Sequence, residues 1–537
     1  MFHKFNGRRR FLQNAALFST SLMTSLVGVR RSIASDVAVD ALVIGSGFGG
    51  AVAALRLGQA GISTLVLERG RPWPTYPLTN AQNTFATFRK PDGRAAWLSP
   101  RTYDGVPVDV YTGVLERKDG NGISVLTGAG VGGGSLVYNG ITYQPPRELF
   151  YRSFPSSINY DELEQIYYPR VRKMLAASPI PPDILATSYY LGSRVFLEQA
   201  AVAGLPSRLL DIAVNWDIVR QEINGTRVPS AIIGEHWYGI NSGAKNSLDK
   251  NYLLQAEQTG HVNILPLHLV TAISEEPGFG YRVSVGQIND TGEIVATKTF
   301  TCRYLFLGAG SMGTSALLVK AKATGTLPKL NNYIGLDWGG NGDTLSTRSG
   351  LPKPTNPGQG GPATAAIEYF DNPFGPISIT GPGAVWNAPD GTLTSLSMSI
   401  PSVKGEFRYD ATTGLVNLIW PGEDPQVMQI AKFAYRLLDR KNATSTNNPT
   451  TETMLGSVPP RKTRTSIDMI PLSAHPLGGA VLGKACDLYG RVMNYKGLYV
   501  VDGALIPGAT GCVNPSLTIA ALAERNMEQI LKHDIMT

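Results

Sequence analysis

The sequence predicts an α/β fold, and three consecutive features near the start of the chain predict it. Residues 41–44 form a short apolar run, residues 45–50 are rich in glycine, and an alanine- and leucine-rich stretch continues to about Gln59. A second apolar run, 64–67, ends in Glu68. Strands that are apolar along their whole length are typical of a parallel sheet with both faces covered. The order strand, glycine turn, helix, strand therefore indicates a Rossmann-like βαβ unit.

The glycine turn has the spacing of a dinucleotide-binding loop. Its candidate residues are Gly45, Gly47, Phe48, Gly49 and Gly50, and Glu68 follows 18 residues after the last of them. Glycines let backbone amides approach a pyrophosphate at a helix N-terminus, and an acid at the end of the second strand can bind ribose hydroxyls. The alternative is a plain βαβ turn that binds nothing.

Two further glycine-rich runs occur, at 128–135 and after the apolar residues 305–307. The first is dense in small residues, which favours backbone packed directly against a large flat ligand. The second is typical of a strand followed by a tight turn. Taken alone, either run is equally compatible with a simple tight loop, and the motifs do not decide between NAD and FAD.

The last eighty residues hold the sharpest group of polar candidates. His475 precedes a proline, which favours an extended backbone. Asn514 precedes Pro515 and an apolar stretch from about Ser516, a pattern that predicts an asparagine N-cap with proline at the first helical position. The partial positive charge of that helix terminus suits an anionic ring or an alkoxide. The alternatives are a histidine satisfied within a core or loop, and an asparagine that only caps a helix.

Charge is concentrated at the N-terminus of the 537-residue chain. The formal net charge is +7, and residues 1–34 contain six basic residues and no acid. The remaining 42 basic and 41 acidic residues nearly cancel. This balance gives no electrostatic footprint for nucleic acid.

Residues 1–34 are predicted to be a twin-arginine signal peptide. Arg8, Arg9 and Arg10 precede a moderately apolar stretch, 11–29, and small residues at 32–34 offer a cleavage site. The sequence therefore predicts export of a folded protein to the periplasm or the medium. A disordered basic N-terminus is the alternative. Three cysteines (Cys302, Cys486 and Cys512) are too few for a disulfide framework, and no His/Cys spacing suggests a metal site.

Longer motifs resemble the glucose–methanol–choline (GMC) flavoenzyme family, and within it the members that oxidise sterols. They are GSGFGG, GAGVGGGSLV, YLFLGAGSMGTSALL, HPLGGAVLGKACDLYGRV and VVDGALIPGATGCVNPSLTIAALAERN. The resemblance runs from about Ala38 to the C-terminus. It implies non-covalent FAD, an α+β substrate-binding part with a six-stranded antiparallel sheet over the flavin, and oxidation of a sterol 3β-hydroxyl with O2 reduced to H2O2.

The resemblance also assigns roles to individual residues. His475 and Asn514 fall where the family places the reacting centre. An imidazole can hold a hydroxyl and accept its proton, and the amide of Asn514 can orient the substrate oxygen and face the flavin. The implied adenine and ribose contacts are Phe48, Gly49, Glu68 and Val270. The implied flavin contacts are Gly134, Ser135, Gly503 and Asn514.

Two positions depart from the family pattern. Tyr138 stands where the family has an asparagine, so the flavin contact is expected from Asn139 instead. Sterol oxidases of this type also isomerise the double bond with a glutamate beyond an aromatic-Asp-Asn segment. That segment is present at 369–372, but residues 373–389 contain no acid, and Ser378 falls near the expected place. We therefore expect oxidation without isomerisation; Glu368, on a neighbouring stretch, is the nearest carboxylate.

The motifs interleave two parts of the chain. The predicted FAD-binding part comprises 36–75, 115–150, 245–345 and 460–537, and the substrate-binding part 151–244 and 346–459. Segment 76–114 is predicted to be a lid or extension. The alternative is ordinary core, which is the more frequent role of aromatic residues spaced like Trp73, Tyr76, Phe85, Phe88 and Trp97. Transient contact with a membrane surface is expected of a protein that takes up a sterol.

Three other functions remain open at this point. The chain could oxidise a different bulky alcohol, or pass electrons to a quinone as a dehydrogenase. It could also bind flavin or sterol without turnover, although His475 and Asn514 argue against that.

Overall fold

The computed structural model describes residues 37–75, 84–386, 388–442, 445–447 and 472–536. The predicted signal peptide, 1–34, and Tyr76 lie outside the described residues. Within them, the predicted βαβ unit is present: β1 (Val37–Ile44) leads into α2 (Phe48–Gln59) and then β2 (Thr64–Leu67).

A mixed seven-stranded sheet carries this unit. Its strands are β6 (Val262–Leu265), β2, β1, β9 (Ile294–Leu307), β8 (Gly280–Ile288) and β7 (His268–Glu276) in that order, with β18 (Leu498–Val500) also paired to β9. The pairings among β6, β2, β1, β9 and β18 are parallel, whereas β9, β8 and β7 are antiparallel neighbours. Ala41, Leu42 and Val43 are fully buried because both faces of the central strand are covered.

Helices α2, α9 (Tyr252–Gln258) and α12 (Ser516–Ile530) pack together beside this sheet. A buried ion pair joins the first and last of them: Arg56 on α2 donates two hydrogen bonds of 2.7 Å to the carboxylate of Glu524 on α12. Tyr252 on α9 donates to the same carboxylate at 2.8 Å. A single buried acid thus holds together three helices that are far apart in sequence.

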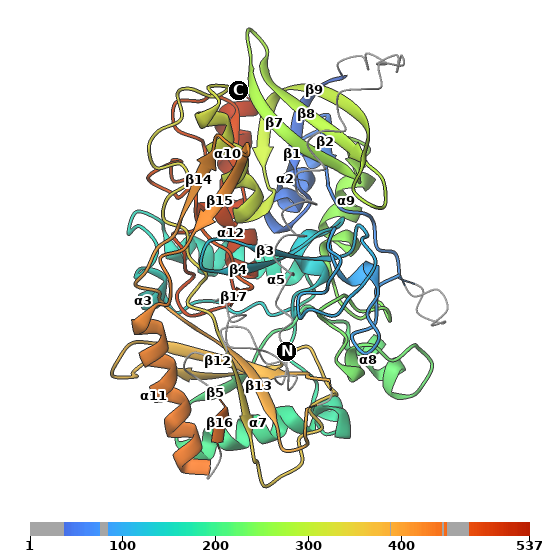
Figure 1. Cartoon of the computed structure of the whole chain (residues 1–537), viewed down its shortest axis with the longest axis vertical. Helices are drawn as coiled ribbons and strands as arrows, with labels where there is room; N and C mark the ends of the chain where they lie inside the picture. The colour runs from blue at the N-terminus through green and yellow to red at the C-terminus, as the bar shows by residue number, and fades with distance from the viewer. Residues whose placement is uncertain (1–36, 76–83, 387, 443–444, 448–471, 537) are drawn as a thin grey trace, which may run out of the picture. The chain divides into compact units, whose positions relative to one another are not determined.

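The six-stranded antiparallel sheet expected from the family resemblance is present. Its strands are β16 (Ser445–Asn447), β10 (Thr344–Ser349), β13 (Leu393–Ser399), β12 (Ile377–Gly383), β11 (Ala365–Tyr369) and β5 (Ser207–Leu209). Helices α7 (Leu191–Ala203) and α11 (Pro425–Asn442) pack on it (Figure 1). Ala366, on the opposite face, packs in a cluster with Ile141 and Val513.

Smaller elements complete the described chain. Two are sheets: β17 (Leu472–Ser473), β4 (Ser124–Gly128) and β3 (Leu115–Asp119) form one, and β14 (Glu406–Asp410) and β15 (Leu415–Ile419) the other. The other α-helices are α3 (Arg147–Phe150), α4 (Tyr160–Glu162), α5 (Tyr168–Met174), α6 (Pro182–Leu185), α8 (Trp216–Ile223) and α10 (Gly310–Ala323). The 3-10 turns are η2 (Gly93–Ala95), η3 (Gly133–Leu136), η5 (Ser188–Tyr190), η6 (Ala231–Ile233), η7 (Leu248–Lys250) and η8 (Gly503–Leu505), and the π turns are η4 (Leu163–Tyr167) and η9 (Leu531–Ile535).

The aromatic residues before and within 84–114 pack as ordinary core. Trp73 and Phe85 are buried and stacked at 5.2 Å, Trp97 is buried, and Phe88 lies against Tyr238 at 5.6 Å. The lid assignment for this segment stays a prediction.

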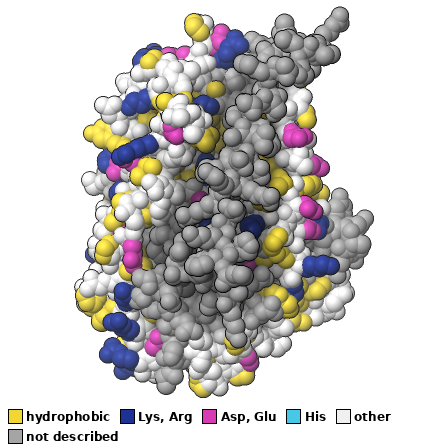
Figure 2. Space-filling view, in the orientation of Figure 1, with side chains coloured by type: hydrophobic (Ala, Val, Ile, Leu, Met, Phe, Trp, Pro, Cys, Tyr) yellow, Lys and Arg dark blue, Asp and Glu magenta, His cyan; other side chains and the backbone are white. Residues whose placement is uncertain are grey.

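The described surface shows charge of both signs. Lys and Arg side chains are dispersed among Asp, Glu and uncharged side chains on the face shown in Figure 2. Among the described helices, none is long and apolar enough to cross a bilayer.

Replacing Glu524 by Ala is expected to lower the free energy of unfolding by about 3 kcal/mol, because Arg56 and Tyr252 lose a buried partner. Urea unfolding of the two proteins measures the difference. Glu528→Ala is the matched control: Glu528 is half exposed and pairs with Arg170 at 3.4 Å, so its loss should cost at most about 0.5 kcal/mol. Equal effects of the two substitutions would contradict this account.

Candidate active site

The first glycine loop follows β1 and is shaped by close packing. A Cβ on Gly49 would lie 1.8 Å from the carbonyl oxygen of Val501, and one on Gly50 would lie 2.0 Å from that of Gly45. Gly45 itself has a φ of +92° and passes close to Gly308. These three glycines are needed so that α2 can start against the ends of β1, β9 and β18.

Gly47, in the same loop, faces open space. A Cβ there would meet no atom within 4 Å, and the same holds for Gly134 in the second glycine run. The two runs touch, since a Cβ on Gly133 would lie 2.7 Å from the Cα of Gly47. Backbone from two distant segments therefore borders one open surface. A thin, flat dinucleotide with a pyrophosphate fits such a surface.

Glu68 and Val270 lie at one end of this loop. The Glu68 carboxylate is buried and accepts hydrogen bonds from the backbone N–H of Ser46 (3.0 Å), the hydroxyl of Ser46 (2.7 Å) and the backbone N–H of Gly70 (2.9 Å). Val270 is on β7, which begins where the N–H of His268 bonds the Glu68 carbonyl at 2.9 Å. Val270 therefore lies two residues beyond the strand start that is bonded to Glu68, and Glu68 also fixes the glycine loop.

Ser135 and Gly503 serve the packing of the site. The hydroxyl of Ser135 donates to the Gly132 carbonyl at 2.7 Å and accepts from the N–H of Leu248 at 3.0 Å. The carbonyl of Gly503 accepts from the N–H of Gly478 at 2.9 Å, so the segment after His475 runs directly onto the segment after β18. Their contacts with the flavin stay predictions.

Asp502 forms hydrogen bonds with the third glycine run, which follows β9. Its buried carboxylate accepts from the N–H of Gly310 at 2.8 Å and from the hydroxyl of Thr314 at 2.6 Å. Burial raises the pKa of this carboxyl to about 6, against the opposing effect of these hydrogen bonds. All three glycine runs and Gly503 therefore meet near the carboxyl ends of parallel strands, the usual place for a nucleotide.

His475 and Asn514, the two residues predicted for the reacting centre, lie side by side. The Nε2 atom of His475 is 3.3 Å from the Nδ2 atom of Asn514. On the other side of the ring, Nδ1 is 2.7 Å from Oδ1 of Asp343, a residue that is 3% exposed. Asn514 is largely buried, and its Oδ1 has no hydrogen-bond partner in the described structure. Because Nδ2 only donates, Nε2 is the acceptor in this contact, and the pair offers a hydroxyl-bearing ligand an amide donor as well as an acceptor.

The N-cap prediction for Asn514 is wrong. Helix α12 starts at Ser516 as expected, but Pro515 occupies the N-cap position and no side chain caps the helix. The amide of Asn514 is turned toward His475 instead. The helix N-terminus nevertheless lies two residues from Asn514, so its partial positive charge remains at the site.

Comparison with known proteins assigns the family. A family model described as GMC oxidoreductase matches residues 417–523, and one described as FAD binding domain matches residues 40–93. Cholesterol oxidase from Mycobacterium tuberculosis is 28% identical over 90% of either chain. Cholesterol oxidase from Acinetobacter baumannii is 25% identical over 92% of this chain and 95% of that protein. This chain belongs to the GMC oxidoreductase family. Its cofactor is FAD, and it acts on the CH–OH group of an alcohol.

The fold agrees with that of a solved oxidase structure. Pyridoxine 4-oxidase from Mesorbium loti superposes with a TM-score of 0.61 over 92% of this chain and 99% of that one, at 18% identity. At this identity the likeness shows the fold alone.

The departure from the family pattern at Tyr138 has a structural consequence. The Tyr138 ring packs edge-on against Phe48 at 5.3 Å, and the Oδ1 atom of Asn139 accepts from the N–H of Ala363 at 3.2 Å. Asn139 thereby ties the second glycine run to the segment before β11. Its contact with the flavin stays a prediction.

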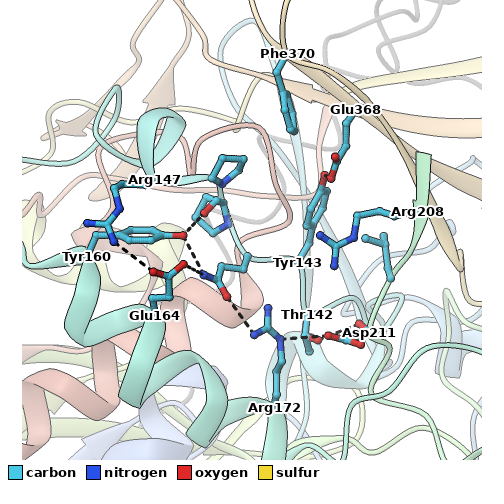
Figure 3. A pocket seen from close by; sticks show the side chains of 14 residues that line it. Thr142, Tyr143, Arg147, Tyr160, Glu164, Arg172, Arg208, Asp211, Glu368 and Phe370 are labelled. Atoms are coloured by element: carbon cyan, nitrogen blue, oxygen red, sulfur yellow. Dashed lines mark hydrogen bonds and ion pairs between the residues drawn. The ribbon is translucent and has the colours of Figure 1, made fainter. Parts of the chain in front are cut away.

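A cavity of about 450 Å3 lies at the β5–β11 edge of the six-stranded sheet. Its lining includes Arg147, Arg172 and Arg208, and Tyr143, whose hydroxyl donates to Glu368 at 2.6 Å (Figure 3). Neither His475 nor Asn514 lines it. No cluster able to hold a metal ion occurs among the residues that the structure describes.

Asp343 and Asn341 are site residues that the sequence analysis missed. Both follow Trp338 in a short glycine-rich turn before β10. The only sequence signal was an acid directly after such a turn, which is too common to single out.

Gly47→Ala is expected to weaken FAD retention at least tenfold with little change in apoprotein stability, because the methyl group projects only into the open surface. Gly49→Ala, the matched control, should destabilise the fold itself, since its Cβ collides with backbone. Flavin-to-protein ratio and melting temperature of the apoprotein separate the two effects. Full FAD retention in Gly47→Ala would contradict the assignment of FAD to the open surface beside Gly47 and Gly134.

Proposed function

We propose that this flavoenzyme oxidises the 3β-hydroxyl of a cholesterol-like sterol to the ketone, with O2 as electron acceptor and H2O2 as product. The observation that carries the proposal is the His475–Asn514 pair, in which an imidazole nitrogen lies 3.3 Å from the amide nitrogen and the amide oxygen has no partner among the described residues. Similarity to two cholesterol oxidases along about nine-tenths of the chain supports the sterol as substrate.

The two side chains divide the work on the hydroxyl. The Nε2 atom of His475 accepts the hydroxyl proton, and an N–H of the Asn514 amide donates to the hydroxyl oxygen and keeps it oriented. When bound, FAD supplies the hydride acceptor and passes the electrons to O2. The N-terminus of α12 favours negative charge that develops beside Asn514.

Apolar side chains pack next to the pair. Ile141 and Val513 are buried in one cluster with Ala366 of the six-stranded sheet. Val513 directly precedes Asn514, so the cluster adjoins the reacting centre.

We propose that the double bond is not isomerised. The hydroxyl of Ser378 donates to the carbonyl of Cys512 and is no base. Glu368 lies opposite Ser378 on the adjacent strand, and accepts from Tyr143 beside the cavity of Figure 3. Its carboxylate is therefore already held one strand away from the expected place.

Cholesterol in detergent should give H2O2 and an unconjugated ketone, measured by a peroxidase assay and the ultraviolet spectrum of the product. A conjugated enone would contradict oxidation alone, and its loss in Glu368→Gln would identify Glu368 as the base. An absence of peroxide with intact flavin would overturn the sterol proposal in favour of another bulky alcohol or a quinone acceptor.

We also propose export by the twin-arginine route, supported by Arg8–Arg10 and the stretch that follows. Replacing Arg8 and Arg9 by Lys should retain the protein in the cytoplasm, as cell fractionation would show. Unchanged export of the double variant would contradict this.

We also propose transient contact with a membrane surface, because a sterol substrate is taken from a bilayer.

A further inference from the structure

Both carboxylate oxygens of Asp343 are hydrogen-bonded to the segment that carries His475. Oδ1 lies 2.7 Å from Nδ1 of His475. Oδ2 accepts from the backbone N–H of Ala474 at 3.1 Å and lies 3.3 Å from the hydroxyl of Ser473. Because a backbone N–H can only donate, the Oδ2 position must hold an acceptor. The carboxylate therefore cannot rotate to present a different atom to the histidine without losing a bond.

This arrangement decides which ring nitrogen of His475 carries the proton. An ionised carboxylate only accepts, so Nδ1 must be the N–H, and in the neutral ring Nε2 then holds the lone pair. Nε2 is the nitrogen beside Asn514, whose Nδ2 donor at 3.3 Å suits the same tautomer. A proton arriving at Nε2 creates an imidazolium next to the buried negative charge of Asp343, which stabilises it.

We propose that Asp343 is a positioning residue for the alcohol oxidation: it fixes the Nδ1–H tautomer of His475 and stabilises the imidazolium that forms when Nε2 takes the hydroxyl proton. Asp343 makes and breaks no covalent bond. The inference rests on the proposed role of His475 in the reaction, and deepens it.

The same turn also supports Asn514. Asn341 donates from Nδ2 to the carbonyl of Val513 at 2.9 Å and accepts from the N–H of Thr510 at 3.0 Å. Two residues of one turn thus fasten the loops that carry His475 and Asn514. This explains how segments 39 residues apart hold a fixed side-chain pair.

Asp343→Asn tests the proposal sharply. The amide oxygen of the new side chain is required at the Oδ2 position by the N–H of Ala474, so its NH2 group faces Nδ1 of His475. That donor forces Nδ1 to hold the lone pair and puts the proton on Nε2, which can then no longer act as the base. We expect kcat to fall about ten-thousandfold, the order seen when a carboxylate-to-amide change inverts a catalytic tautomer. KM and FAD content should change less than threefold.

Histidine 15N NMR of the FAD-loaded protein gives a readout that does not depend on turnover. The His475 signal is assigned by its loss in His475→Ala. The Nδ1 resonance should be of the N–H type in the wild-type protein and of the lone-pair type in Asp343→Asn. The matched control is Asp337→Asn. Asp337 lies six residues before Asp343 and forms a partly exposed ion pair with Lys484. The substitution should leave tautomer and kcat unchanged.

Each outcome decides a separate point. A wild-type Nδ1 without a proton, or an Asp343→Asn protein that keeps both the tautomer and kcat within tenfold, would overturn the positioning role. A protein that shows the expected tautomers but leaves cholesterol unoxidised would overturn the proposed substrate and support the role of Asp343. Loss of stability or FAD with an unchanged tautomer would make Asp343 merely structural, and would also overturn the proposal.

Discussion

The site depends on the short turn that runs from Asn341 to Asp343. Through Asn341 it binds the loop before Asn514, and through Asp343 it binds the ring of His475. These polar groups are buried, so leaving any of them without a partner would cost about 1–3 kcal/mol. That cost favours a single arrangement of the loops, because a shift of one loop would leave several buried groups without hydrogen-bond partners.

Close backbone packing is the second constraint. Gly45, Gly49 and Gly50 let β1, α2 and the ends of β9 and β18 approach to distances that exclude a side chain. Gly47 and Gly134 are glycines of another kind, since they border open surface rather than backbone. One motif therefore combines residues that build the fold with residues that leave room for FAD.

Much of this could be predicted from the sequence. What could not be predicted depends on contacts between residues that lie far apart in the chain. The βαβ unit depends on neighbouring residues, so its strands, helix and loop could be placed from periodicity and glycine spacing. The second sheet and the roles of His475 and Asn514 came from family resemblance. Asp343 could not be found, because it lies 132 residues before His475 and only the fold brings them together. Asn514 was assigned a helix cap because local pattern cannot show that His475 competes for its amide.

Anaerobic titration of the purified yellow protein with cholesterol tests the central claim most directly. The account predicts that the visible flavin absorbance bleaches in proportion to the sterol added, and that the bleaching is slowed strongly in His475→Ala with FAD retained. Flavin that is reduced by dithionite but unchanged by excess cholesterol would contradict the assignment of a sterol-oxidising site.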